Sequence, residues 1–417
     1  MYFASKQNAI FHTQYIFMRS MRATAFRLTA AVTLILAAES SLNAQQKINV
    51  VTTAVPFLRI SPDARAGGMG DLAIATSPDA SSSYFNLGKV PFNISKGGAN
   101  VTYTPWLKNL VNDVYLASLA GYYKIDDLQA ISGSLRYFSL GDIQFTDENG
   151  NNVSSGRPRE FGIDIGYSRR LSDRTGVGVG LKYINSNLAQ GYAGNSGNIY
   201  KAGNAVAADL GFYHNRQDEA GQGWSFGAAL SNLGSKIAYT DNAEQKDFIP
   251  ANLGLGTTYT RVLDESNKFT LGVDVNKLLV PTPPVFDPNP TNDPAVTEEN
   301  AQKAREYRQQ GVLGSWFKSF GDAPDGMSEE FKEFNMSLGA EYWYNNQFAV
   351  RAGYFYEDRS KGNRRYFSTG VGLKYNVFGL NFSYLIPSGG SGANQNPLSN
   401  TLRFSLVFDL DNMTTEE

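Results

Sequence analysis

Cysteine is absent from the 417-residue chain, and histidine occurs only twice. Without cysteine the fold contains no disulfide, and lipid attachment to an N-terminal cysteine is excluded. His12 precedes an apolar leader, and we expect His214 to be solvated beside a turn. Ser-His-Asp and Cys-His catalysis need a base beside a nucleophile, and neither zinc-type nor calcium-type ligand spacing is present. The sequence therefore predicts a protein that is not an enzyme and needs no cofactor and no metal.

Charge and long apolar runs are also scarce. Charged residues make up 18% of the chain and the net charge is −2, which does not suggest a nucleic-acid partner. The apolar run Leu28–Ala38 has 11 residues, against the ~20 of a spanning helix, and it follows three arginines. With the small Ala44 at a plausible cleavage site, it predicts a signal peptide rather than a membrane anchor. We assign residues 1–44 to the signal peptide and upstream residues. No later apolar run is long enough for a helical span.

Glycine and aromatic residues are abundant, with 41 Gly, 23 Tyr and 26 Phe. Several segments alternate large apolar residues with small or polar ones, as 161–168, 176–183, 367–375 and 402–409 do. In the first of these, one face carries the apolar set Phe161, Ile163, Ile165 and Tyr167, and the other carries Gly162, Asp164, Gly166 and Ser168. A period of two is typical of strands, and runs of about ten such residues are typical of membrane barrels. The pattern predicts an all-β fold, a transmembrane antiparallel β-barrel.

The alternation extends over fourteen segments, an even number as in bacterial barrels. The predicted strands are 98–106, 113–125, 128–142, 159–170, 175–188, 203–213, 223–233, 251–262, 268–280, 334–344, 347–358, 366–375, 378–385 and 400–409. Connections after even strands are mostly short, and those after odd strands tend to be longer, as in 143–158, 189–202, 234–250, 281–333 and 386–399. This regularity would not arise in a soluble sandwich. It predicts short periplasmic turns, long outer loops and both termini in the periplasm.

The predicted inner face carries both cations and glycines. Lys182, Arg351, Lys374 and Arg403 share the glycine-bearing face, where they avoid a cost of ~2–4 kcal/mol for facing lipid. The glycines imply room for a plug against the wall or a bend in the strand. Gly176, Gly178 and Gly180 do not form a phosphate loop, because their spacing is that of a strand and no helix start follows.

Residues 45–97 precede the first strand and are predicted to form a plug segment, while residues 98–410 form the barrel. The plug contains the dense motif Phe57–Asp71. Ser-Pro-Asp-Ala occurs at 61–64 and again at 77–80, so each copy is expected to open a short helix with Ser at the cap and Pro next. The plug either packs inside the barrel or forms a ligand or partner site.

The predicted loop 281–333 is the longest. It begins rich in proline, continues through a charged helical run and reaches the apolar segment 312–320. One helical face there carries Val312, Leu313, Trp316, Phe317 and Phe320. The face could be a lid on the barrel rim, dip into the outer leaflet or dock a protein partner. For docking, the candidate partner-binding residues are Trp316, Phe317 and Phe320.

The motif Phe57–Asp71, followed by Ala75-Thr76-Ser77-Pro78-Asp79-Ala80-Ser81-Ser82-Ser83-Tyr84-Phe85-Asn86, closely resembles the start of PorV (LptO) proteins. These are outer-membrane components of the type IX secretion system of Bacteroidota. The resemblance covers the whole mature chain. One departure is Asn86-Leu87-Gly88-Lys89, where relatives usually carry Asn-Pro-Ala-Lys, which bears on the local turn. A second is the nine-residue tail after Phe408.

The resemblance implies a plugged barrel similar to the long-chain fatty-acid transporters. It also implies a role in which the barrel binds secreted cargo by its C-terminal domain. The cargo would then pass to a cell-surface attachment complex with a sortase-like peptidase, so the implied partners are cargo, that complex, the secretion translocon and outer-membrane lipid. The alternative function is an uptake channel for small hydrophobic molecules. Large aromatic-bearing loops favour the shuttle, whereas an apolar pocket and a breach in the wall would favour uptake.

Overall fold

The computed structural model describes residues 48–106, 113–146, 149–189, 199–241, 246–286, 294–388 and 401–410. The predicted signal peptide lies outside this part of the chain. Among the described residues, no helix is both long and apolar enough to cross a membrane.

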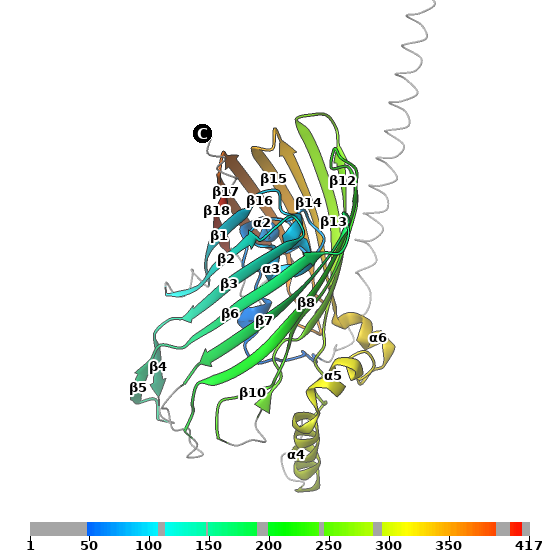
Figure 1. Cartoon of the computed structure of the whole chain (residues 1–417). Coiled ribbons are helices and arrows are strands. Elements are labelled where there is room, and N and C mark those ends of the chain that lie inside the picture. Colours follow the sequence, from blue (N-terminus) through cyan, green and yellow to red (C-terminus); the bar gives the residue numbers. More distant parts are fainter. Residues whose placement is uncertain are drawn as a thin grey trace, which may run out of the picture. The chain divides into compact units, whose positions relative to one another are not determined.

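Fourteen strands form a closed antiparallel barrel, in which each strand is hydrogen-bonded to a neighbour on either side (Figure 1). The barrel strands are β1 (Gly97–Pro105), β2 (Val114–Lys124), β3 (Gln129–Leu140), β6 (Arg159–Arg170), β7 (Thr175–Asn187), β8 (Gly203–Gln217), β9 (Gly223–Gly234), β12 (Asn252–Val262), β13 (Asn267–Leu278), β14 (Phe334–Tyr344), β15 (Phe348–Tyr356), β16 (Arg365–Tyr375), β17 (Phe378–Pro387) and β18 (Leu402–Leu410). Closure leaves no free sheet edge in the wall, as a lipid environment requires. The predicted architecture is confirmed.

The predicted strands agree with the observed ones to within two residues at every end but one. The exception is the strand predicted over 203–213, which continues to Gln217. The predicted facing is also observed: Ile163 and Ile165 are exposed on the outside of β6, and Lys182 and Arg403 are buried inside. Apolar and polar residues alternate along these strands because apolar side chains face the lipid and polar or charged ones face the lumen.

The two ends of the barrel differ. One end carries brief turns, and the other carries long connections with additional elements (Figure 1). These elements are the hairpins β4 (Ile143–Thr146) with β5 (Asn152–Gly156) and β10 (Ile237–Ala238) with β11 (Lys246–Asp247), and the helices α4 (Pro294–Gln309), α5 (Val312–Lys318), α6 (Met327–Glu330) and η3 (Phe331–Glu333). We refer to the short-turn end and the long-loop end of the barrel.

The segment before β1 crosses the barrel interior. It contains η1 (Pro56–Arg59), α2 (Ala64–Gly67), α3 (Ser82–Phe85) and η2 (Leu87–Phe92). At its start, the Asn49 N–H donates to the Ser360 carbonyl at the long-loop end, 3.0 Å away. At its finish, the Lys124 N–H donates to the Lys96 carbonyl at the short-turn end, 2.7 Å away. The segment, here called the plug, therefore runs the length of the lumen.

This crossing changes where the chain ends lie. Fourteen strands return the chain to the end where β1 began, so Leu410 lies at the short-turn end. The plug adds one more traverse before β1, which puts the first described residues at the long-loop end. The termini themselves lie outside the described residues, so the expectation that both are periplasmic stays a prediction.

Glycines in the wall make room for the plug. A Cβ on Gly353 would lie 2.0 Å from the carbonyl carbon of Met69, and one on Gly178 would lie 2.5 Å from the Leu87 Cβ. Gly370 approaches Gly68 so closely that a Cβ would lie 3.0 Å from its Cα. Of the two explanations for the inward glycines, a plug against the wall is the one observed.

The repeated Ser-Pro-Asp-Ala motif does not cap helices as expected. Helix α2 is capped by Asp63, whose carboxylate accepts from the Ala66 N–H at 2.9 Å, and not by Ser61. Helix α3 begins only at Ser82, after the second motif has ended. Asp79 of that motif instead accepts from the Ser81 N–H at 2.9 Å. In both copies, the aspartate is the side chain that organises the turn.

Candidate functional site

Helix α5 of the longest connection turns its serine side inward. Ser315 and Ser319 are buried, and each hydroxyl donates to a main-chain carbonyl three residues earlier. Leu313 and Phe317 lie on the outside, and Phe317 is 80% exposed. A lid would bury the apolar side of this helix. In the described helix Leu313 and Phe317 stay exposed while Trp316 is half-buried, and the two small serines, which satisfy their own hydroxyls, face the interior at little cost.

The three residues predicted to bind a partner lie in different environments. Phe317 projects from α5, Trp316 is half-buried and Phe320 follows the end of the helix. The Phe320 ring centroid is 5.6 Å from the Lys277 Nζ, so one side of that ring faces the barrel rim. Phe317 is therefore the most exposed residue of the three.

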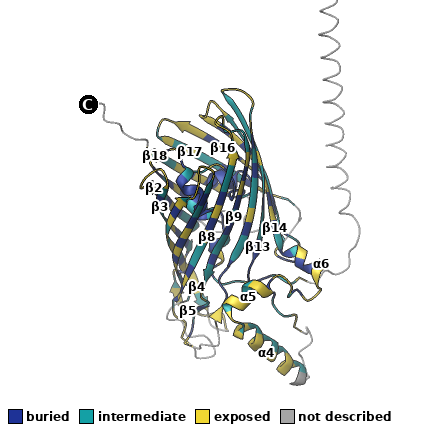
Figure 2. Ribbon diagram, turned by 45° about the vertical axis from the view of Figure 1, so that its right-hand side comes forward, coloured by how far each residue is buried: buried dark blue, intermediate teal, exposed yellow. Residues whose placement is uncertain are grey.

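Further large apolar side chains are exposed on the same connection. Together with Phe317 they form the exposed apolar set: Leu313, Phe317, Phe320, Met327 and Phe331. Figure 2 shows exposed residues over α5 and α6 at the long-loop end. Exposed apolar residues gathered on one element are typical of interaction surfaces.

A buried ionic cluster ties this connection to the barrel. We call it the anchor; its members are the buried Lys277, Glu329, Glu330, Glu333 and Lys361, with the half-buried Asp322 beside them. Lys277 Nζ lies 2.6 Å from Glu330 Oε1 and 2.7 Å from Glu333 Oε2. Lys361 Nζ lies 2.5 Å from Glu329 Oε1 and 3.0 Å from Glu333 Oε1. Since Lys277 is the penultimate residue of β13 and Lys361 follows β15, the anchor joins α6 and η3 to two places on the rim.

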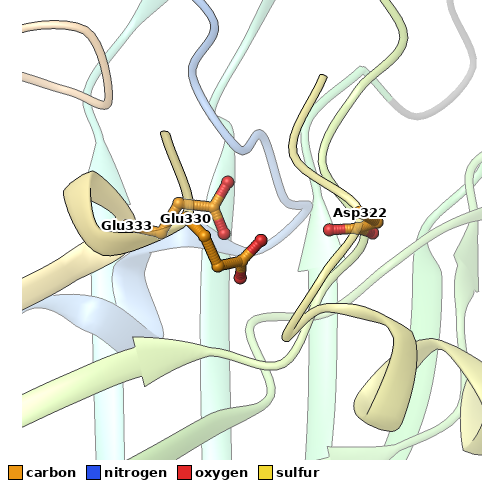
Figure 3. Close-up of side chains that lie close together, drawn as sticks. All are labelled: Asp322, Glu330 and Glu333. Carbon is orange, nitrogen blue, oxygen red and sulfur yellow. The ribbon is translucent and has the colours of Figure 1, made fainter. Parts of the chain in front are cut away.

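Three carboxylates of the anchor have the spacing of a metal-binding group. Oxygen atoms of Asp322, Glu330 and Glu333 lie within 4.8 Å of one another, and Figure 3 shows Asp322 across from the two glutamates. However, the Lys277 ammonium sits against both glutamates, and Lys361 reaches Glu333. A further cation would meet two ammonium groups. The two lysines therefore offset part of the negative charge of the four anchor carboxylates.

The pKa values in the anchor move in opposite directions. Burial raises the pKa of Asp322, and the nearby Glu333 and Glu330 charges raise it further against the hydrogen bonds from Thr282. Burial acts in the same sense on Glu329, but the hydrogen bond and charge of Lys361 outweigh it and lower the pKa of Glu329. Glu329 is thus held as the charged partner of Lys361.

The start of the plug also contacts this connection. Asn49 Nδ2 donates to Glu329 Oε1 at 3.3 Å. The Ala54 N–H donates at 2.9 Å to the carbonyl of Phe248, which lies in the neighbouring connection between β11 and β12. Val51 packs with Phe248 in a small apolar cluster at the rim. The plug and the long connection are therefore continuous in space.

Within the lumen, a second ionic network holds the plug. Arg65 of α2 makes two hydrogen bonds to Glu341, of 2.9 and 2.8 Å, and its Nη1 lies 2.7 Å from Asp79 Oδ2. Arg351 Nε lies 2.7 Å from the same Glu341. A bidentate arginine–carboxylate pair fixes geometry as well as charge. Arg403 adds a contact of 2.9 Å to Asp71.

His214 lies within β8, beside the short turn between β6 and β7, where its Nδ1 and the Thr175 Oγ1 are 2.9 Å apart. The anchor glutamates and Glu341 were not predicted. The closely spaced glutamates at 329–333 could have been noticed, but their lysine partners lie 28 to 56 residues away. Arg65 and Glu341 are 276 residues apart, so no local pattern connects them.

Several solved structures resemble this barrel. The P. putida toluene transporter TodX has a TM-score of 0.47 and 12% identity, with 83% of this chain and 98% of that chain covered. The Ralstonia pickettii toluene transporter TbuX has a TM-score of 0.46 and 11% identity, covering 84% and 97%. A Pseudomonas aeruginosa FadL homologue has a TM-score of 0.45 and 11% identity, covering 87% and 99%. No curated protein matches the chain in sequence.

The sequence model described as "Type IX secretion system protein PorV" matches residues 43–285. That match includes the plug, the strands from β1 to β13 and the beginning of the long connection. It covers more than half of the 417 residues. The chain is an outer-membrane β-barrel that belongs to the PorV family of the type IX secretion system.

Proposed function

We propose that this protein is a non-catalytic cargo shuttle of type IX secretion. It binds the C-terminal domain of secreted cargo at the cell surface and passes the cargo to the attachment complex. The family match supports a place in this secretion system. The observation that supports docking most directly is the outward apolar side of α5 with Phe317 80% exposed, on the longest connection of the barrel.

The orientation belongs to the same proposal. The long-loop end faces the cell exterior and the short-turn end faces the periplasm, as is usual for outer-membrane barrels. The C-terminal end of β18 is then periplasmic, and the first described residues lie at the outer rim. This orientation presents α5 to cargo that has already crossed the membrane.

The interior supports a shuttle over an uptake channel. The plug occupies the lumen and is held by Arg65, Glu341 and Arg351, all buried. Every barrel strand is hydrogen-bonded to a neighbour on either side. An uptake path would require the buried ion pairs to separate, which is costly in a site shielded from water.

The test compares two equally exposed aromatics at opposite ends. Phe317→Ala should weaken capture of a cargo C-terminal domain by about 2 kcal/mol, the effect of one interface hot spot. Tyr375→Ala, which removes a ring also 80% exposed but at the short-turn end, should leave capture unchanged. Capture is measured by pull-down from outer membranes with purified cargo domain. Equal capture by wild type and Phe317→Ala would exclude α5 as the docking element.

A whole-cell measurement distinguishes the shuttle from uptake. Deletion of the gene should leave cargo unanchored with its C-terminal domain uncleaved, while growth on hydrophobic nutrients is normal. Normal anchoring with impaired uptake would contradict the proposal and support the transporter function.

A further inference from the structure

A second feature of the lumen lies on the side of the plug away from the long loops. It is a cavity of about 460 Å³ whose lining includes Gly221 and Asn346, which belong to two of the short turns. The plug segment at Ile94 lies beside it and is almost fully exposed. A volume of this size suits a small molecule.

The cavity wall combines aromatic and charged side chains. Phe92 belongs to the plug and Tyr122 to β2, and Trp343 faces inward from β14. The Arg351 guanidinium lies 5.4 Å from the Trp343 ring centroid. Aromatic rings with a few convergent polar groups are what small-molecule sites usually offer.

The carboxylates in the wall already have partners. Asp63 accepts from the Ala66 N–H, and Asp79 and Glu341 are both paired with Arg65. Asp409 is paired with Lys374 at 2.6 Å. The acceptors that these groups present are therefore in use.

Two cations in the same wall are not fully used. Arg351 is 1% exposed, and its Nη2 has no hydrogen-bond partner, although Nε and Nη1 bond to Glu341 and Asn381. Lys268 has no ion-pair partner within 4.0 Å in the described part of the chain. A buried donor left without an acceptor is unfavourable, and an incoming acceptor relieves it.

We propose that this cavity binds a small anion with an apolar body, entering from the short-turn side. The anionic group accepts a hydrogen bond from Arg351 Nη2, with Lys268 adding positive charge. The body lies against Phe92, Tyr122 and Trp343. A carboxylate or a phosphate fits this chemistry. The site is separate from α5, so cargo capture and ligand binding can fail independently.

The experiment uses the full mature chain in lipid nanodiscs and its tryptophan fluorescence. The probes are 4-nitrobenzoate, 4-nitrophenyl phosphate and the uncharged 4-nitrobenzyl alcohol, all quenchers of tryptophan. We expect saturable quenching by at least one anion and binding of the alcohol weaker by about tenfold, the effect of one charge-assisted hydrogen bond. The stronger of the two anions identifies the head group.

Variants locate the site. Trp343→Phe should remove the saturable quenching, whereas Trp316→Phe, which changes a tryptophan of the outer helix, should retain it. Lys268→Met should weaken anion binding several-fold and Lys318→Met should not. Arg351→Lys keeps the charge without Nη2 and should also weaken binding. Folding of Arg351→Lys is checked by heat-shift electrophoresis. If this variant does not fold, Lys268→Met and Trp343→Phe provide the test.

The proposal is wrong if quenching is linear for both anions or if the alcohol binds as tightly as they do. It is also wrong if saturable quenching survives in Trp343→Phe, because the ligand would then lie elsewhere. If Arg351→Lys folds, and both it and Lys268→Met bind the anion with wild-type affinity, the proposal is equally overturned.

Discussion

The plug lies with its backbone directly against the wall, whereas α6 and η3 reach the barrel through long charged side chains. Gly353 and Met69 are too close to admit even a Cβ between them, and Arg65 shares Glu341 with Arg351. The anchor instead distributes Lys277 and Lys361 among several glutamates near the rim. Among the described residues of the lumen, Arg351 therefore has a single carboxylate partner, whereas each lysine of the anchor has two.

Removing one charge in each region should give the largest difference. Glu341→Gln leaves Arg351 without its ion-pair partner in the lumen and should cost about 3–5 kcal/mol, as for breaking other buried pairs. Glu333→Gln should cost less, because Lys277 keeps Glu330 and Lys361 keeps Glu329. The measurement is the temperature of the heat-shift on electrophoresis. Equal shifts would mean that the two networks do not differ.

The same glycine substitution should have opposite signs in the two regions. Gly353→Ala places a Cβ 2.0 Å from the Met69 backbone, so it should cost about 1–3 kcal/mol and displace the plug. Gly314→Ala meets nothing within 4 Å in α5 and should stabilise that helix by up to about 1 kcal/mol. Unfolding and antibiotic permeability are measured together. A harmless Gly353→Ala would show that the plug is not tightly seated.

Acid should loosen the long connection that carries α6. Because the folded-state pKa of Glu329 is lowered, its contribution is present above the ordinary glutamate pKa of about 4.3 and is lost as the pH falls through the lowered value. Hydrogen exchange at α6 should therefore increase below about pH 4. The Glu329→Gln variant removes the titrating group and should show a smaller change with pH. Identical profiles would exclude this carboxylate as the cause.

Single cysteines introduced at the two ends of the barrel should differ in their accessibility from outside the cell and should leave stability unchanged. The chain has no native cysteine, so single cysteines report without background. On intact cells, Asn149→Cys between β4 and β5 should react with a membrane-impermeant maleimide, and Asp127→Cys between β2 and β3 should not. Labelling at residue 127 alone would reverse the orientation of the two ends.

The strands could be predicted because each residue faces either lipid or the lumen, and this choice is visible at a period of two. The prediction ended β8 early because His214 and the polar residues that follow it no longer alternate. For α5 the helix itself was predictable, but its orientation was not, since the apolar face that suggested a buried lid is the exposed one.

The amino-acid sequence by itself determined the barrel, its strand count, the difference between its ends and the presence of material inside it, because these depend on local alternation and segment length. Only the tertiary structure decided how the plug crosses the lumen, which glycines it touches and where its first described residues lie. It alone paired Arg65 with Glu341, since the plug joins residues whose separation along the chain carries no signal. The unpaired Nη2 of Arg351 was also decided only by the tertiary structure, because a missing hydrogen-bond partner can be recognised only once every neighbouring residue is in place.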